Sequence, residues 1–311
     1  MNYLERALEL AERGRGTTHP NPVVGAVVVT PGGTVVGEGW HERAGEPHAE
    51  VHALRQAGGR AAGATLYVTL EPCARFGRTP PCVDAILAAG VAKVVVGVED
   101  PVQDGVGRLR EAGVQVEVLD TWEARVATEA WRFWVEHDRP WVVYKVATTL
   151  DARVTVPGER WVTGEAARRY VHELRANADA VAVGMGTVRA DAPRLDARDV
   201  EARRQPRRLA FGFGPLPPDS NLELRSRPIE EELRVLAEEG VQSLLLEGGP
   251  TLATAFLELD VIDKLLVFVA PTLSGSGPPP FRDFAGPRDV RHVTVRGVGE
   301  DLLVEAYLRE P

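Results

Sequence analysis

Cysteine is scarce in this sequence, and so is an excess of positive charge. Cys73 and Cys82 are the only cysteines among 311 residues. Two cysteines make no disulfide framework, which excludes the small disulfide-rich secreted class. Lys and Arg number 36 against 45 Asp and Glu, a net charge of −9. Binding to a phosphate backbone depends on clustered cations, so we expect no nucleic-acid partner.

Long apolar runs are also absent. Runs such as residues 265–271 are far shorter than the ~20 residues that a membrane-spanning helix needs. The first ten residues have the pattern of an amphipathic helix, with Asn2 as its N-cap, rather than that of a signal peptide. We therefore expect a soluble, cytoplasmic protein with no membrane partner.

The length predicts two domains at ~150 residues each. In residues 1–120, short β-rich runs alternate with helical stretches, a pattern typical of a three-layer α/β/α domain with a mixed sheet. The expected strands are 23–29, 34–38, 65–70, 93–98 and 114–118. The expected helices are 48–56 and one that opens at residues 80–81, where proline suits the first turn.

We expect a linking helix at 121–136 and a domain boundary at 137–140. A second α/β pattern follows this boundary. We place the domains at 1–137 and 138–311. In the second, the expected strands are 141–147, 180–183, 243–246, 265–269, 291–295 and 302–308. The expected helices are 165–176 and one that follows residues 247–250. Residues 212–229 are rich in proline and weakly periodic, so we expect a loop there.

The segment that carries most chemistry contains His48, Cys73 and Cys82. Zinc takes imidazole and thiolate ligands, and a catalytic zinc keeps three protein ligands plus a water. Cys82 follows Pro81 at a predicted helix start, where the helix dipole favours a thiolate. His48 likewise begins a predicted helix. We therefore expect one Zn²⁺ per chain, held by these three residues.

Glu50 lies two residues beyond His48, within reach of a metal-bound water, and fits a proton shuttle. His52 lies four residues beyond His48, so a site with two histidines is an alternative, although it leaves both cysteines unexplained. The alternative without a metal is that the two cysteines are small, buried side chains of the core. The combination of His-x-Glu with Pro-Cys favours a zinc deaminase site.

Residues 69–82, TLEPCARFGRTPPC, resemble the bifunctional pyrimidine deaminase/reductase of riboflavin biosynthesis. Eight residues separate the two cysteines, whereas most of the cytidine deaminase superfamily spaces them more closely. Segments 21–25 and 45–51 resemble the same family. The resemblance implies a phosphoribosyl-pyrimidine substrate and a cytidine-deaminase-like fold. We expect Asn21 and Arg78 to contact that substrate. The alternatives are that Asn21 only forms a turn and that Arg78 is only a cation in a loop.

Two glycine-rich turns follow strands of the second half, at 184–188 and 247–252. Glycine at a strand-to-helix junction lets backbone N–H groups and the helix dipole meet a phosphate. Arg189 stands where the third glycine of the dinucleotide fingerprint would be. The two turns indicate either a nucleotide cofactor or ordinary tight turns.

Segments 145–153, 161–164 and 172–176, with both glycine turns, resemble the reductase half of the same family, which has a dihydrofolate-reductase-like α/β fold. The resemblance implies NADPH contacts from Ala147, Trp161, Thr187, Asp191, Gly249, Pro250 and Thr251. It implies substrate contacts from Arg175, Leu195, Arg198 and Glu247. Guanidinium groups bind phosphate in two-point fashion, which suits Arg175 and Arg198 to a ribose 5-phosphate.

This chain departs from the family pattern in its second half. Ala152 stands where the family usually has glycine, residues 158–160 lack the usual serine, and the stretch between Arg198 and Ser243 is short. Our main hypothesis is zinc-dependent deamination of the pyrimidine followed by NADPH-dependent reduction of the ribosyl chain to ribityl.

Three alternatives stay open: a deaminase whose second domain is structural or dimerising, a deaminase acting on RNA, and a zinc-stabilised binding module. The acidic balance disfavours RNA, and the binding module requires Glu50 to be dispensable. The family resemblance also implies a homo-oligomer, a dimer or larger.

Overall fold

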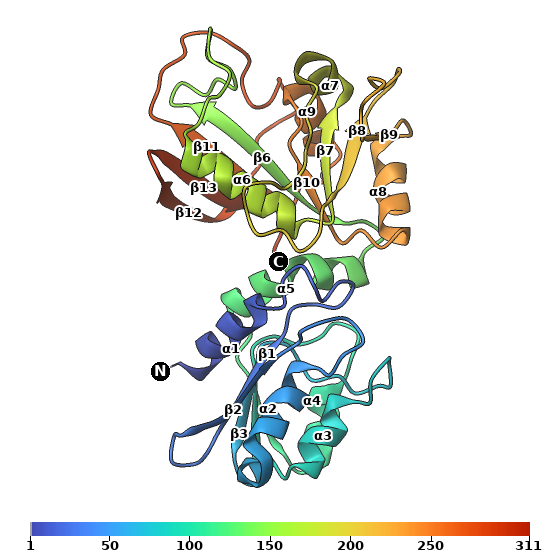
Figure 1. The fold of residues 1–311 in the computed structure, drawn as a ribbon, viewed down its shortest axis with the longest axis vertical. Helices are drawn as coiled ribbons and strands as arrows, with labels where there is room; N and C mark the ends of the chain where they lie inside the picture. Colours follow the sequence, from blue (N-terminus) through green and yellow to red (C-terminus); the bar gives the residue numbers. More distant parts are fainter. Residues whose placement is uncertain (1) are drawn as a thin grey trace. The chain divides into compact units, whose positions relative to one another are not determined.

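The computed structural model describes residues 2–311, which divide into two compact units, residues up to 136 and residues 137–310 (Figure 1). The first unit contains α1 (Tyr3–Glu12), β1 (Gly25–Val29), β2 (Val35–Trp40), α2 (Ala49–Ala57), the short 3₁₀ helix Gly58–Ala61, β3 (Thr65–Val68), α3 (Cys82–Ala88), β4 (Lys93–Val96), α4 (Gly105–Glu111), β5 (Gln115–Val118) and α5 (Trp122–Glu136).

The sheet of the first unit has the order β2-β1-β3-β4-β5. β1 pairs antiparallel with β2 and β3, whereas β3, β4 and β5 are parallel, so the sheet is mixed as predicted. One face packs Leu66 and Val94 against Ile86 of α3 and Leu109 of α4. On the other face, Val27 packs against Leu10 of α1. The predicted three-layer α/β/α architecture is confirmed.

Two glycines of β2 bring α2 close to the sheet. A Cβ atom on Gly37 would lie 2.0 Å from the carbonyl oxygen of Ala53, and one on Gly39 would lie 2.5 Å from that of Ala49. Any larger residue at either position would push α2 outward. The glycines therefore fix the position of the N-terminus of α2, where His48 is the N-cap residue.

The second unit contains β6 (Trp141–Thr149), α6 (Glu165–Asn177), β7 (Ala180–Gly184), α7 (Met185–Asp191), β8 (Arg207–Phe211), β9 (Glu223–Arg225), α8 (Ile229–Glu238), β10 (Ser243–Leu246), α9 (Pro250–Glu258), β11 (Lys264–Ala270), β12 (Arg291–Val298) and β13 (Asp301–Tyr307). Its sheet has the order β12-β13-β11-β6-β10-β7-β8-β9. The six strands from β11 to β9 are parallel, and β13 and β12 complete the sheet antiparallel.

Helices cover both faces of this second sheet. Leu233 of α8 and Phe256 of α9 pack on the face that carries Tyr144 and Leu244. On the opposite face, Val171 of α6 packs against β11 and β13. The unit is an α/β domain, as predicted.

The loop predicted for residues 212–229 is wrong in part, because β9 lies inside it and β8 and α8 flank it. β9 has three residues and is held by parallel pairing with β8, which no local pattern announces. The start of α8 could have been predicted from the sequence, because Pro228 is its N-cap residue and three glutamates lie in its first turn, where the helix dipole favours acidic side chains. Among residues 2–311, no helix is long and apolar enough to cross a membrane.

Candidate active sites

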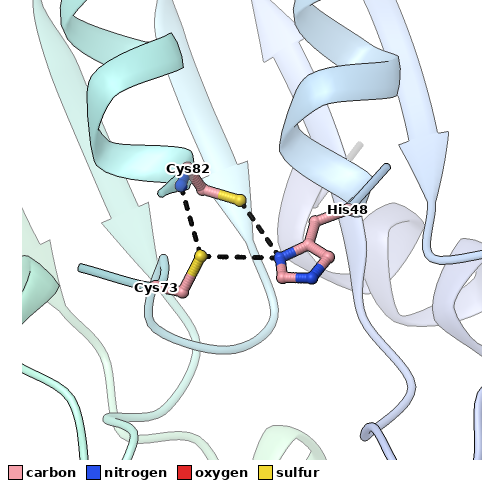
Figure 2. Close-up of side chains that lie close together, drawn as sticks. All are labelled: His48, Cys73 and Cys82. Atoms are coloured by element: carbon pink, nitrogen blue, oxygen red, sulfur yellow. Dashed lines mark hydrogen bonds between the residues drawn. The ribbon is translucent and has the colours of Figure 1, made fainter. Parts of the chain in front are cut away.

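The predicted metal ligands meet at one point of the first unit (Figure 2). Nδ1 of His48 lies 3.5 Å from Sγ of Cys73 and 3.3 Å from Sγ of Cys82. Tetrahedral zinc with ordinary bond lengths holds nitrogen and sulfur ligands ~3.5 Å apart, so the residues fit the ion. Among the residues that the structure describes, this cluster contains the three predicted ligands and not His52, so the site with two histidines gains no support.

Neighbouring groups orient the three ligands. Cys82 is the first residue of α3, and its backbone N–H donates to Sγ of Cys73 at 3.2 Å. Nε2 of His48 lies 3.3 Å from Oγ1 of Thr79, which leaves Nδ1 to face the two sulfurs. Such hydrogen bonds behind a ligand fix the imidazole tautomer and ring orientation.

The two thiols differ in their acidity. The hydrogen bond from the Cys82 thiol, aided by His48, lowers the pKa of Cys73 to about 4. The pKa of Cys82 is raised, because its thiol donates to Cys73 and is buried. One thiolate is thus stable beside His48 by itself, whereas two thiolates need a cation between them.

Glu50 lies in the first turn of α2 and is buried. Within residues 2–311 its Oε2 atom has no hydrogen-bond partner. Burial raises the pKa of this carboxyl above its usual range. A buried carboxyl with a raised pKa and an unpaired oxygen can both accept and return a proton, which is what a general acid–base group does.

A cavity of about 310 Å³ adjoins the ligand cluster. Glu50, His48 and Cys73 line it together with the two residues that we predicted to face a substrate, Asn21 and Arg78. The tertiary structure thus brings all five into one cavity from segments far apart in the sequence. Their contacts with a ligand remain predictions.

Sequence reasoning missed His41, which is buried in the wall of this cavity. Its Nδ1 lies 3.2 Å from the carbonyl oxygen of Pro47, and its Nε2 lies 3.0 Å from Nδ2 of Asn21. When Nδ1–H donates to Pro47, Nε2 accepts from the Asn21 amide, and the amide oxygen is left for a ligand. A lone histidine without a motif gave no signal for this role.

Glu71 was also missed, although it stands in the cysteine motif. It is buried, and its carboxylate accepts from the backbone N–H groups of Asp100 at 3.0 Å and Val106 at 2.8 Å. These bonds tie the loop that carries Cys73 to the start of α4. Glu71 therefore helps to hold the position of Cys73, one of the predicted metal ligands.

In the second unit, two predicted substrate residues form an ion pair whose side chains are largely buried. Nε and Nη2 of Arg175 lie 2.6 and 2.9 Å from the two carboxylate oxygens of Glu247. Arg198, the more exposed of the two predicted arginines, donates to Asp196 at 2.6 Å. Leu195 is buried with a φ of +55° and turns the chain into this segment.

Lys145 on β6 was not predicted as a site residue. Its Nζ lies 3.8 Å from Oε2 of Glu247, and burial lowers its pKa. Arg175 and Lys145 together place two cations around one carboxylate. This cluster can offer both positive groups and a carboxylate acceptor to a polar ring.

The residues predicted to contact a nicotinamide cofactor lie in three places. Ala147 lies on β6, and Trp161 lies between β6 and α6 with its side chain half exposed. The guanidinium carbons of Arg160 and Arg168 lie 4.9 and 5.5 Å from the centroid of the Trp161 ring. The remaining predicted contacts lie in α7 and at the start of α9: Thr187, Asp191, Gly249, Pro250 and Thr251.

The two glycine turns come together in space. A Cβ atom on Gly249 would lie 3.6 Å from Oγ1 of Thr187, so the start of α9 is in close contact with α7. Both helices follow strands at the same end of the sheet (Figure 1). This is the edge at which parallel α/β sheets bind nucleotides.

Comparison with known proteins finds relatives along the whole chain. Residues 1–98 match the cytidine and deoxycytidylate deaminase zinc-binding region, and residues 140–304 match the RibD C-terminal domain. The riboflavin biosynthesis protein RibD of Mycobacterium tuberculosis is 43% identical, with 97% of this chain and 96% of the relative covered. RibD of Aquifex aeolicus is 40% identical, with 97% of each chain covered.

Solved structures agree with these relatives. A Thermotoga maritima structure described as a diaminohydroxyphosphoribosylaminopyrimidine deaminase/5-amino-6-(5-phosphoribosylamino)uracil reductase is 34% identical, with a TM-score of 0.86. The match covers 98% of this chain and 97% of that one. The similarity therefore includes both units and not the first alone.

Proposed function

The chain belongs to the RibD family of bifunctional riboflavin-biosynthesis deaminase/reductases, and from this premise we propose which residues carry each step. The enzyme has a zinc-binding deaminase half and a reductase half. We assign residues 1–137 to the deaminase with its linking helix and residues 138–311 to the reductase. The family match to the second half favours two activities over a deaminase with a structural remnant.

In the deaminase half, the substrate is a diaminopyrimidinone ribosyl 5-phosphate bound in the cavity beside the ligand cluster. His48, Cys73 and Cys82 would hold Zn²⁺, which would act as a Lewis acid and lower the pKa of a water molecule to ~7. Glu50 takes the proton that the attacking water loses and passes protons to the ring nitrogen and the departing amine. Ammonia leaves, and the amino-bearing carbon becomes a carbonyl.

Asn21 and Arg78 bind the substrate in this proposal. Asn21, held through its amide nitrogen by His41, presents its oxygen to a donor on the pyrimidine. Arg78 on the cavity wall pairs with the phosphate, for which a guanidinium is suited. The observation that carries the deaminase assignment is the ligand cluster with the unpaired, buried Glu50 oxygen beside it.

In the reductase half, the deaminated product is reduced at C1′ of its ribosyl chain. NADPH would supply the hydride to C1′ of the ring-opened ribose, and a proton taken up from solvent would complete the reduction. The protein supplies position and charge. Ala147, Trp161, Thr187, Asp191 and the start of α9, Gly249, Pro250 and Thr251, hold the cofactor. Arg198 binds the substrate phosphate, Leu195 packs against the substrate, and Glu247, fixed by Arg175 and Lys145, faces the pyrimidine.

One experiment tests both halves. The purified, zinc-loaded enzyme is given the diaminopyrimidinone substrate, and ammonia release is measured before NADPH is added. We expect ammonia without NADPH, then loss of the NADPH absorbance and a ribityl product by mass. Absence of ammonia contradicts the deaminase assignment, whereas ammonia without NADPH consumption contradicts the reductase assignment.

Two further expectations rest on the family alone. We propose that the enzyme is a homo-oligomer, a dimer or larger, and that it acts in the cytoplasm on small-molecule substrates. Light scattering on the protein in solution measures the mass of the particle, and a monomer mass at working concentrations contradicts the first expectation.

A further inference from the structure

The loop that carries Cys73 is held by residues 100–108, a segment that contains none of the three predicted metal ligands. Two backbone N–H groups of this segment donate to the carboxylate of Glu71. The side chain of Gln103 accepts from the backbone N–H of Ala74 at 3.2 Å. The position of the loop therefore depends on a neighbouring segment that lies behind the metal site.

One side chain of this segment reaches both of the chain segments that carry a cysteine. Arg108 of α4 donates through Nη1 to the carbonyl oxygen of Ala74 and through Nη2 to Oδ1 of Asp84, the latter at 3.0 Å. Ala74 is the residue after Cys73, and Asp84 lies two residues beyond Cys82 in the first turn of α3. The guanidinium therefore bridges the two segments whose sulfur atoms must meet at one ion.

The two cysteine segments also contact each other directly, next to the sulfur atoms. The backbone N–H of Cys82 donates to Sγ of Cys73 at 3.2 Å, and that of Val83 donates to the carbonyl oxygen of Cys73 at 3.3 Å. These bonds join the two segments at one place. Arg108 joins them at a second place, which restrains the rotation of one segment about the other.

The contribution of the Arg108–Asp84 ion pair to stability does not explain this bridge. The two side chains are 41% and 50% exposed. Ion pairs at such exposure add little to the free energy of unfolding, because water screens the charges and ordering two long side chains costs entropy. What distinguishes Arg108 is that one planar guanidinium donates to acceptors on two different segments. Its effect should therefore fall on the spacing of the two sulfur atoms.

We propose that Arg108 is a positioning residue of the metal site, which holds Cys73 and Cys82 at the separation that a tetrahedral ion requires. It acts through the backbone of the Cys73 loop and through the first turn of α3. Groups that orient metal ligands in this way raise metal affinity, because less order has to be created when the ion binds. The inference rests on the proposed function, namely that His48, Cys73 and Cys82 bind Zn²⁺.

Metal affinity measured apart from catalysis tests this inference. The purified, metal-free enzyme is titrated with Zn²⁺ in competition with a chromophoric chelator of known affinity. We expect Arg108→Ala to bind Zn²⁺ more weakly than the parent by a factor of ~10 or more, as for the loss of a group that orients a metal ligand. The thermal unfolding midpoints of the metal-free proteins should differ little, because the lost ion pair is half exposed.

Arg110→Ala is the matched control, since Arg110 lies on the same helix and donates to the carbonyl oxygen of Val116 at 3.4 Å. Val116 belongs to β5 and to neither cysteine segment. This variant should bind Zn²⁺ as the parent does. Arg108→Lys keeps the charge but lacks the planar fork that reaches two acceptors, so its affinity should stay close to that of Arg108→Ala.

A double-mutant cycle with Asp84 tests the bridge itself. Asp84→Ala should weaken Zn²⁺ binding in the parent, and this loss should shrink in the Arg108→Ala background, because the two residues act through one contact. Co²⁺ supplies a spectroscopic measurement of the same site. The visible absorption of a tetrahedral cobalt–thiolate centre should need a higher cobalt concentration in Arg108→Ala than in Arg110→Ala.

The outcomes separate this inference from the function on which it rests. If the parent binds Zn²⁺ and Arg108→Ala binds it with the parent's affinity, the assignment of Arg108 is overturned and the metal site stands. Full recovery of affinity in Arg108→Lys assigns the effect to charge and overturns the two-point bridge. Losses from Asp84→Ala and Arg108→Ala that add in full also overturn the bridge. If the parent binds no Zn²⁺, the metal assignment and this inference both fail.

Discussion

Arg175 and Glu247 lie 72 residues apart in the sequence and form a two-point ion pair, with N–O distances of 2.6 and 2.9 Å. Both side chains are largely buried, and Lys145 lies 3.8 Å from the same carboxylate. Burial by itself raises a carboxyl pKa, yet Arg175 and Lys145 hold the pKa of Glu247 below its usual value. The carboxylate is therefore charged when substrate arrives.

Removing the Glu247 carboxylate should leave the largely buried cations Arg175 and Lys145 without their counter-ion. We expect Glu247→Ala to lower the free energy of unfolding by ~3–5 kcal/mol, the usual cost of breaking a buried ion pair from one side. Glu247→Gln, which keeps the shape, should cost less stability and still raise the reductase KM. Urea unfolding and reductase kinetics measure the two effects, and deaminase activity is the internal control. Equal stability of Glu247→Ala and the parent would contradict the prediction.

Glu50→Gln should abolish deamination without emptying the metal site. The amide cannot exchange protons with water and amine, so we expect the rate of ammonia release to fall by ~10²–10⁴. Zinc content by elemental analysis should stay at one per chain, and the reductase should still act on deaminated substrate. Normal ammonia release from this variant would contradict the role of Glu50 as the proton shuttle.

Chelation should separate the two activities. Removing zinc leaves Cys73 and Cys82 without the cation that allows both thiolates, and it removes the Lewis acid. We expect loss of ammonia release, recovery on adding Zn²⁺, and little change in reduction of deaminated substrate. The Cys73 thiolate should become reactive toward a thiol reagent after chelation, whereas the buried Cys82 thiol, whose pKa is raised, should react more slowly. Deamination that survives verified zinc removal would refute the metal assignment.

The contact between Asp151 and the loop at residues 274–275 should weaken in acid. Its carboxylate accepts from Thr149 Oγ1 and from the backbone N–H groups of Ser274 and Gly275, which lowers its pKa from 3.8 to about 2. Because the folded pKa is depressed, the stabilisation is complete above pH 3.8 and is lost as the pH falls through about 2.

Asp151→Asn should therefore be less stable than the parent at neutral pH, and the difference should shrink on acidification. Urea midpoints of both proteins across that range measure the effect. A difference that stays constant with pH would show that the charge of Asp151 is not the cause.

Ala152 has a φ of +55°, a conformation that glycine adopts without a steric penalty. Ala152→Gly should be neutral or stabilising by up to ~1 kcal/mol, since the relief of strain exceeds or balances the greater freedom of glycine in the unfolded chain. Ala166→Gly, at an exposed position in the first turn of α6, is the control and should destabilise by up to ~1 kcal/mol. Thermal unfolding measures both, and a loss of equal size in the two variants would contradict the argument.

Local sequence was enough to predict the three metal ligands, because each lies in a short motif and two of them lie at a helix start. His48 caps α2 and Cys82 begins α3, as proline and the helix dipole indicate. The alternation of apolar runs was likewise enough for the α/β class and the mixed sheet of the first unit. The strand β9 could not be read in this way, because its three residues are held by pairing with β8.

The rest depended on contacts between distant segments. No spacing announces that His41 holds Asn21, that Lys145 meets Glu247, or that Arg108 reaches Asp84. These contacts form when strands pair and helices pack, so they follow from strand order rather than from local propensity. Local sequence was enough to single out the two cysteines and the histidine, whereas the cavity beside them and the meeting of the two glycine turns at one edge of the second sheet depend on how distant strands and helices pack.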